Sequence, residues 1–194
     1  MTDFDEFFLM DYMRALNPSA LAPLSVSNFS FNPEFRSLCE ANHCGHFNKQ
    51  WMCPPHVGEV DTLVSEVKSF ERAIVYQFIG ELEHSMDWKG TLAAGASFKK
   101  ITLQIVDDLI PRLIDERESK DAKAVLLLGC GPCPYCKVCA FQENEPCRHP
   151  DKAVRSLEAN CVDVSALAAE CGLKYINGPN TVTFFGSLLY KDKS

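Results

Sequence analysis

Three cysteines recur at every third position in the second half of the chain, in the run Cys133-Pro-Tyr-Cys136-Lys-Val-Cys139. A fourth, Cys147, follows after seven further residues. Three closely spaced thiolates can wrap around a body larger than one ion, as they do around iron–sulfur clusters. Zinc sites more often use two well-separated C-x₂-C pairs around one small ion. The spacing therefore favours a [4Fe–4S] cluster over zinc, with these four cysteines as its ligands.

A second group of cysteines lies nearer the N-terminus. Cys39, Cys44 and Cys53 fall within fifteen residues, and Pro54-Pro55 follows directly. A cysteine followed by proline also occurs in ferredoxin-type sites, and proline has no amide to donate. This first group along the chain predicts a further metal centre with three local ligands.

The fourth coordination position at the first group has two possible fates. Cys130 precedes the closely spaced row and can reach across to the other group, as in two-cluster ferredoxins. Alternatively, one iron is left open and acts as a Lewis acid, whereas a fully ligated cluster carries electrons. The candidate metal ligands are therefore Cys39, Cys44, Cys53, Cys130, Cys133, Cys136, Cys139 and Cys147.

The remaining residues near these groups are expected to support the centres rather than to bind metal. Trp51 and Phe47 are expected to shield the first group. Cys161 and Cys171 lie in apolar, helical sequence and are expected in the core. The nearby histidines are expected to be solvated or hydrogen-bonding neighbours; they are His43, His46, His56 and His149.

Ten of the 194 residues are cysteine. This cysteine content, about 5%, is below the roughly 8–10% of small disulfide scaffolds. A chain of this length also does not need disulfides to fold. The cysteines therefore indicate metal or redox chemistry in a reducing compartment. The first six residues carry net negative charge, where a secretory signal would be basic. No apolar run reaches the roughly 18 residues of a membrane span, so a cytoplasmic protein is expected.

The net charge of −7 argues against nucleic acid and anionic membranes as partners. A redox partner protein or a small-molecule substrate is expected instead, and the sequence sets no oligomeric state. Four cations lie near the second cysteine group, where they can stabilise a charged cluster or receive an anion. They are Lys137, Arg148, Lys152 and Arg155.

Apolar periodicity predicts an N-terminal helix over residues 1–17 with Phe4, Phe7 and Phe8 on its apolar face. Pro111 is expected to end or kink a helix. The segment of small residues from Gly90 to Ser97 resembles a phosphate-binding loop but lacks its lysine. The latter segment is expected to be a close-packed helix start. Further helices are predicted over 60–67, 98–109 and 163–171.

Strands are predicted over residues 74–79 and 124–128, and a terminal β-hairpin over 173–176 and 181–190. Helices and strands alternate in the middle of the chain, without repeats or long linkers. The expected fold is therefore α/β (α+β): a single domain, residues 1–194, with a mixed sheet covered by helices. The cysteine groups occupy two loops, 39–55 and 130–150.

Four motifs carry a family resemblance: Ala41-Asn-His-Cys44-Gly-His-Phe-Asn-Lys-Gln-Trp51-Met-Cys53-Pro-Pro55, Gly129-Cys-Gly-Pro-Cys133-Pro-Tyr-Cys136-Lys-Val-Cys139, Pro146-Cys147-Arg148-His-Pro150 and Ser156-Leu-Glu-Ala159. In this order they resemble an uncharacterised prokaryotic family of cysteine-rich proteins predicted to bind metal, over roughly residues 25–190. The resemblance implies an anaerobic setting and all the candidate ligands except Cys130. A small residue is more usual at that position, which favours an open or externally completed first site.

The leading functional hypothesis is an iron–sulfur protein with two [4Fe–4S] clusters that transfers electrons in anaerobic metabolism. A second hypothesis is an enzyme that binds a small substrate at an open iron of one cluster. A third is a zinc-binding structural or interaction module.

Overall fold

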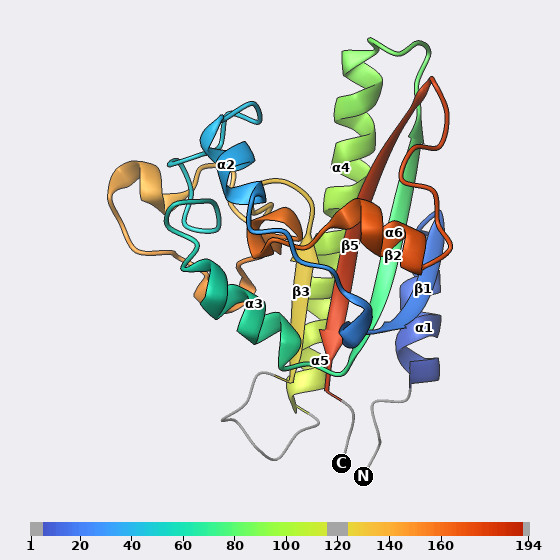
Figure 1. Cartoon of the computed structure of the whole chain (residues 1–194), viewed down its shortest axis with the longest axis horizontal. Helices are drawn as coiled ribbons and strands as arrows, with labels where there is room; N and C mark the ends of the chain where they lie inside the picture. Colours follow the sequence, from blue (N-terminus) through green and yellow to red (C-terminus); the bar gives the residue numbers. More distant parts are fainter. Residues whose placement is uncertain (1–5, 116–123, 192–194) are drawn as a thin grey trace.

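The computed structural model describes residues 6–115 and 124–191. Its centre is a five-stranded mixed sheet in the order β1-β2-β5-β3-β4 (Figure 1). Only β3 and β4 pair in parallel; the other neighbouring strands are antiparallel. The strands are β1 (Ala20–Ser25), β2 (Arg72–Glu81), β3 (Val125–Gly129), β4 (Arg155–Ser156) and β5 (Thr181–Tyr190).

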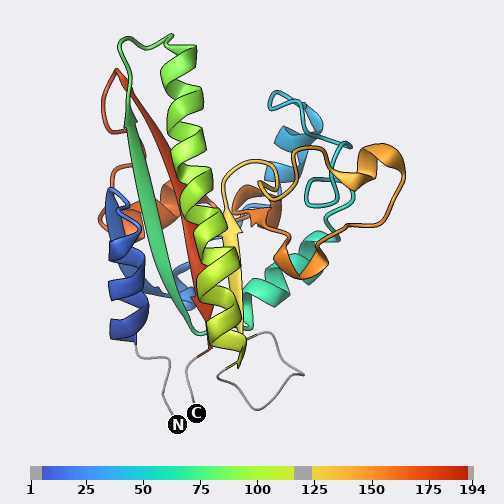
Figure 2. The same cartoon turned by 180° about the vertical axis from the view of Figure 1, so that it is seen from behind.

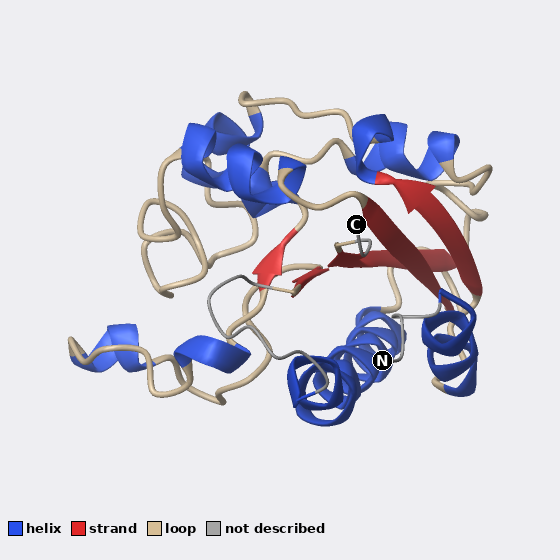
Figure 3. Ribbon diagram, turned by 90° about the horizontal axis from the view of Figure 1, so that it is seen from below, coloured by secondary structure: helices blue, strands red, loops and turns tan. Residues whose placement is uncertain are grey.

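Helices cover both faces of this sheet, as the view from below shows (Figure 3). The helices α1, α4 and α5 lie on one face, and α3 and α6 lie on the other. The mixed sheet covered by helices confirms the expected fold class. The α-helices are α1 (Glu6–Ala15), α2 (Phe35–Glu40), α3 (Val60–Lys68), α4 (Trp88–Gln104), α5 (Ile110–Asp115) and α6 (Val164–Glu170).

Successive side chains of a strand point to opposite faces of the sheet, and this divides the core into two layers. On β2, Ile74 and Tyr76 pack towards α1 and α4, whereas Ala73 and Val75 pack towards α3 and α6. Neighbouring β5 follows the same period of two: Leu188 and Tyr190 belong to the first layer, and Leu189 belongs to the second. Both sheet faces are therefore closed by apolar contacts, and the functional loops lie at one side of the sheet.

The long helix that lies in front of the sheet in Figure 2 continues through Pro111. A π-helical turn, Ile105–Leu109, separates α4 from α5 and widens the helix just before the proline, which lacks an amide donor. Residues 90–97 lie inside α4, whose first turn is capped by Asp87 accepting from the Gly90 amide at 2.8 Å. The segment is thus part of a helix start as expected, but it is not close-packed throughout, because Ala94 is buried whereas Leu92, Ala96 and Ser97 are exposed.

Two predictions about the ends of the chain were wrong. In α1, Leu9 and Met13 face the core, whereas Phe7 is 67% exposed; Phe4 lies outside the described residues. The terminal hairpin is absent, because β5 already has β2 on one edge and β3 on the other. Residues 173–176 form no strand, although the Lys174 carbonyl accepts a hydrogen bond from Gln77.

Within the described ranges, none of the helices combines the length and apolar character that a membrane crossing requires.

Candidate metal centre

The two cysteine loops lie side by side at one side of the sheet, away from α1 (Figures 1 and 2). The first loop leaves α2 and runs to α3, and the second begins where β3 ends. Leu128 on β3 pairs with Ser187 on β5, so Cys130 follows the same register to a place beside Phe185. The backbone amide of Phe185 donates a hydrogen bond to the Cys130 thiol. The sheet thereby fixes Cys130 at the root of the second loop.

The first group of cysteines shares one cavity with Cys130. This cavity of about 550 Å³ is lined by Cys39, Cys44, Cys53 and Cys130. Its wall also contains aromatic, imidazole and carboxyl side chains, which include Phe47, His43, His46, Tyr175 and Glu158. The structure therefore brings Cys130 to the three cysteines that the sequence left without a fourth.

The second group lines a separate, much smaller cavity of about 20 Å³. All four cysteines of the spaced row, Cys133, Cys136, Cys139 and Cys147, contribute to its wall. Met52 and Trp51 from the first loop cover part of it. The spaced row of four thus lines one cavity, and the group of three lines the other together with Cys130, whose place the spacing left open.

The thiols line the walls of these cavities without converging on a point. Among the described residues, no three His, Cys, Asp or Glu side chains lie close enough together to hold a single metal ion. All ten cysteines are free thiols; Cys44 is exposed and most of the others are half-buried. The donor sets are therefore rich in sulfur and spread over a wall in each cavity.

Burial raises the pKa of two thiols of the first cavity, Cys53 and Cys130, so both are protonated at neutral pH. It raises the pKa of Cys53 to about 12, and the neighbouring thiols of both groups add to the effect. Burial also raises the pKa of Cys130 to about 12, assisted by the negative charge of Glu158. Since metal binds the thiolate, a metal that enters here must displace these protons and supply the charge that stabilises the sulfur.

Backbone amides already face one thiol of the second group. Burial raises the pKa of Cys133, whereas hydrogen bonds from the backbone of Tyr135 and Val154 lower it. Such N–H···S bonds favour the charged form of the sulfur and are among the features that tune cluster potentials.

Aromatic side chains fasten the two loops together. The indole Nε1 of Trp51 donates to the carbonyl of Glu145 at 3.0 Å. The Trp51 ring packs edge-on against Phe141, with 5.1 Å between centroids, and His56 lies 4.4 Å from the same phenyl ring. The expectation that Trp51 shields the first group was wrong: Trp51 lies over the second cavity, and only Phe47 lines the first.

The π-helical turn reaches the second loop through Asp107. Its Oδ1 accepts from Lys152 Nζ at 2.8 Å and from Tyr135 Oη at 3.1 Å. These bonds, that of Lys152 first, hold the pKa of Asp107 below its ordinary value. Two other cations of this region are also paired, Arg148 with Glu143 and Arg155 with Glu66. Much of the local positive charge is therefore offset by carboxylates.

The supporting residues lie mostly as expected. His56 Nε2 donates to Asn48 Oδ1 over 2.7 Å, and the ring of His149 lies tilted against that of Tyr135, with 4.8 Å between centroids. Cys161 is fully buried and Cys171 packs against the core, which confirms their structural role.

One acidic residue of the first cavity was not foreseen. Glu158 is half-buried in its wall, where burial raises the pKa of the carboxyl group. The available signal was its place in the Ser156-Leu-Glu-Ala159 motif, which has no chemistry of its own when read as sequence.

An α+β domain with two four-cysteine cavities side by side defines a cysteine-rich protein with the donor chemistry of a metal-binding site. The chain belongs to the family described as "Predicted metal-binding protein (DUF2284)", whose family model matches residues 22–190. Neither a curated protein nor a solved structure matches the chain.

Proposed function

We propose that this protein binds two [4Fe–4S] clusters and transfers electrons in the cytoplasm of an anaerobically growing cell. The observation that carries the proposal is the division of eight cysteines between two adjacent cavities, four to each. The cysteine spacing in the sequence independently gives the same set of four and the same group of three, and leaves only Cys130 open.

The geometry favours a cluster over zinc. A zinc ion draws four ligands to about 2.0–2.3 Å from one centre, so its ligand atoms crowd together. The thiols here line cavity walls, and in the described part of the chain no three candidate ligands converge on one ion. In the first cavity, of about 550 Å³, four sulfur donors spread around a space match the corners of a larger body better than they match one ion, whereas at the second site the cysteine spacing carries the argument.

Each set of cysteines has a defined part in this proposal. Cys39, Cys44, Cys53 and Cys130 hold the first cluster, and the four cysteines of the second cavity hold the other. A bound [4Fe–4S] cluster supplies one-electron redox chemistry at a potential that its surroundings set. The amide of Phe185 at Cys130, and those of Tyr135 and Val154 at Cys133, stabilise thiolate charge and thereby raise that potential.

The position of Cys130 separates an electron carrier from the alternative of an open iron. With Cys130 in the wall of the first cavity, both sites have four cysteines at hand. Complete ligation leaves no iron free for a substrate, which supports electron transfer as the function.

Replacing Cys130 tests this assignment. We expect Cys130→Ala, reconstituted anaerobically with iron and sulfide, to lose about half of both elements relative to the wild type. Cys171→Ala is the matched control, because Cys171 is half-buried against the core and lines neither cavity. Full iron and sulfide content in Cys130→Ala would show that Cys130 is not a ligand, and would favour the enzyme with an open iron over the electron carrier.

A further inference from the structure

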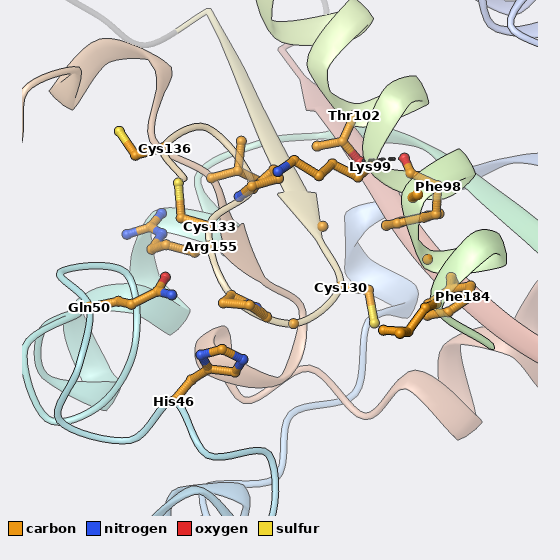
Figure 4. A pocket seen from close by; sticks show the side chains of 18 of the residues that line it. His46, Gln50, Phe98, Lys99, Thr102, Cys130, Cys133, Cys136, Arg155 and Phe184 are labelled. Atoms are coloured by element: carbon orange, nitrogen blue, oxygen red, sulfur yellow. Dashed lines mark hydrogen bonds between the residues drawn. The ribbon is translucent and has the colours of Figure 1, made fainter. Parts of the chain in front are cut away.

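A third cavity, of about 520 Å³, lies between α4 and the loop that follows β3 (Figure 4). Phe98, Lys99 and Thr102 of α4 form one wall, and Phe184 of β5 lies beside them. The opposite wall belongs to the cysteine loops, and its residues include His46, Gln50, Cys130, Cys133, Cys136, Lys137 and Arg155.

The charge of this cavity is opposite to that of the protein. The chain has 26 acidic and 19 basic residues. The cavity wall nevertheless contains three cations, Lys99, Lys137 and Arg155, and no aspartate or glutamate. A wall with only positive charges, in an acidic protein, attracts anions.

Two of these cations lack a protein partner. Arg155 is largely buried, with 12% of its side chain exposed, and is paired with Glu66. Lys99 and Lys137 are exposed at the cavity, and neither makes an ion pair or side-chain hydrogen bond to any residue that the structure describes. In Figure 4, Lys99 extends from α4 across the cavity towards Cys133 and Arg155. Like charges that face one space repel, and a bound anion removes that cost.

Much of the α4 side of the cavity is apolar. The rings of Phe98 and Phe184 are stacked with 5.5 Å between centroids. Gly95 lies next to Phe184, where an added Cβ would sit 3.7 Å from the ring, so the small residues of α4 leave this surface open. Leu92 and Val154 extend the apolar wall. A ligand that fits both halves has an apolar body and an anionic end.

We propose that this cavity binds a small organic anion, with its carboxylate or phosphate between Lys99 and Lys137 and its apolar part on Phe98 and Phe184. Cys130 of the first group and Cys133 of the second line the same cavity, so the ligand lies beside both metal centres. This binding site depends on the cations and rings of the chain, and goes beyond electron transfer as proposed above.

The lysines have an alternative role, which is to balance the charge of metal-bound thiolates. In that case Lys99→Gln and Lys137→Gln change metal content or reduction potential, and the protein binds no anion. The two roles therefore give different results when anion binding and metal content are measured on the same sample.

The test is calorimetric titration of anaerobically purified, metal-loaded protein with four anions and one neutral probe. Benzoate and phenyl phosphate carry an apolar ring, acetate and inorganic phosphate carry none, and benzamide carries no charge. We expect the ring-bearing anions to bind more tightly than the small ones and benzamide not to bind. The stronger of benzoate and phenyl phosphate identifies the anionic group.

Substitutions then locate the site. Lys99→Gln and Lys137→Gln should each weaken the binding of the better probe by about tenfold. Lys100→Gln is the matched control, because Lys100 is the exposed neighbour of Lys99 on α4 and does not line the cavity. Absence of binding of both ring-bearing anions to the wild type, or affinities unchanged in Lys99→Gln and Lys137→Gln, would overturn the anion site.

Metal analysis of the same samples keeps this inference separate from the proposed function. Iron and sulfide without anion binding reject the anion site alone. Anion binding that responds to both lysines, in a protein that takes up no iron, supports the site and rejects the iron–sulfur proposal.

Discussion

The indole Nε1 of Trp51 donates a hydrogen bond of 3.0 Å to the backbone carbonyl of Glu145. Trp51 stands two residues before Cys53 and Glu145 two residues before Cys147, so this bond joins the two cysteine loops next to a candidate ligand of each. The two cysteine loops are therefore mechanically connected, although they come from segments far apart in the sequence.

Replacement of Trp51 by phenylalanine should loosen both centres. Trp51→Phe keeps an aromatic ring against Phe141 and removes the hydrogen bond, which contributes about 1 kcal/mol. We expect metal to be lost to a chelator about fivefold faster. Trp88→Phe, at an exposed position of α4, should leave the rate unchanged. Equal rates for Trp51→Phe and wild type would mean that the loops are held by other contacts.

Two adjacent aspartates of the π-helical turn provide a matched pair for the second centre. Asp107 binds Tyr135 and Lys152 on the second loop, whereas Asp108 binds Tyr12 and Arg112 on the opposite side. Asp107→Asn should speed chelator-driven loss of metal from the second centre a few-fold, because the amide weakens two bonds to the loop. Asp108→Asn should not. The account of the π-helical turn is contradicted if both variants behave alike.

A glycine opposite Tyr76 is required for packing between the two central strands. Gly186 pairs with Tyr76 across the sheet, and an added Cβ would lie 2.3 Å from the tyrosine Cζ. Because Tyr76 is fully buried and has no room to move, Gly186→Ala should lower the free energy of unfolding by about 1–3 kcal/mol.

The control for Gly186 is Gly95 of α4, where an added Cβ meets no atom closer than 3.7 Å. Gly95→Ala should preserve stability or raise it by up to about 1 kcal/mol, because alanine favours the helix. Denaturant unfolding measures both variants, and a Gly186→Ala protein as stable as wild type would refute the close packing at Tyr76.

Glu6 ties α1 to the sheet in a pH-dependent way. Its Oε2 accepts from Arg72 Nη2 at 2.5 Å and from Tyr190 Oη at 2.7 Å, and these bonds lower the pKa of the carboxyl group below its ordinary 4.5. A carboxyl group whose pKa is lower in the folded state stabilises that state at pH values above its ordinary pKa. This stabilisation is lost as the pH falls through the lowered pKa of the folded state.

Glu6→Gln should therefore reduce the free energy of unfolding at neutral pH, by less than about 1 kcal/mol because the pair is partly exposed. The difference from wild type should shrink below pH 4.5. Glu81→Gln, at an exposed position of β2, is the control. A difference for Glu6→Gln that stays constant from pH 7 to pH 3 would contradict this role.

Features encoded by neighbouring residues could be predicted from the sequence. The spacing of Cys133, Cys136 and Cys139 fixes three thiols near one another, and the apolar run at 124–128 predicts the buried strand that the structure has at Val125–Gly129, directly before Cys130. The helix from Asp163 was equally readable, because its cap and its glycine stop are local signals.

Features that depend on distant residues could not be predicted. The terminal hairpin failed because β5 pairs with β2 and β3, and local turn signals do not report which strands compete for an edge. Trp51 was assigned to its neighbours in sequence and instead covers the other cavity. Lys99 and Lys137 share a wall only because α4 packs beside the loop after β3.

The central claim is that the eight cysteines hold two clusters. Iron, acid-labile sulfide and zinc, measured per chain on anaerobically reconstituted protein, test it most directly. The account predicts about eight iron and eight sulfide per chain, with little zinc. One or two equivalents of zinc, without iron or sulfide, would contradict it.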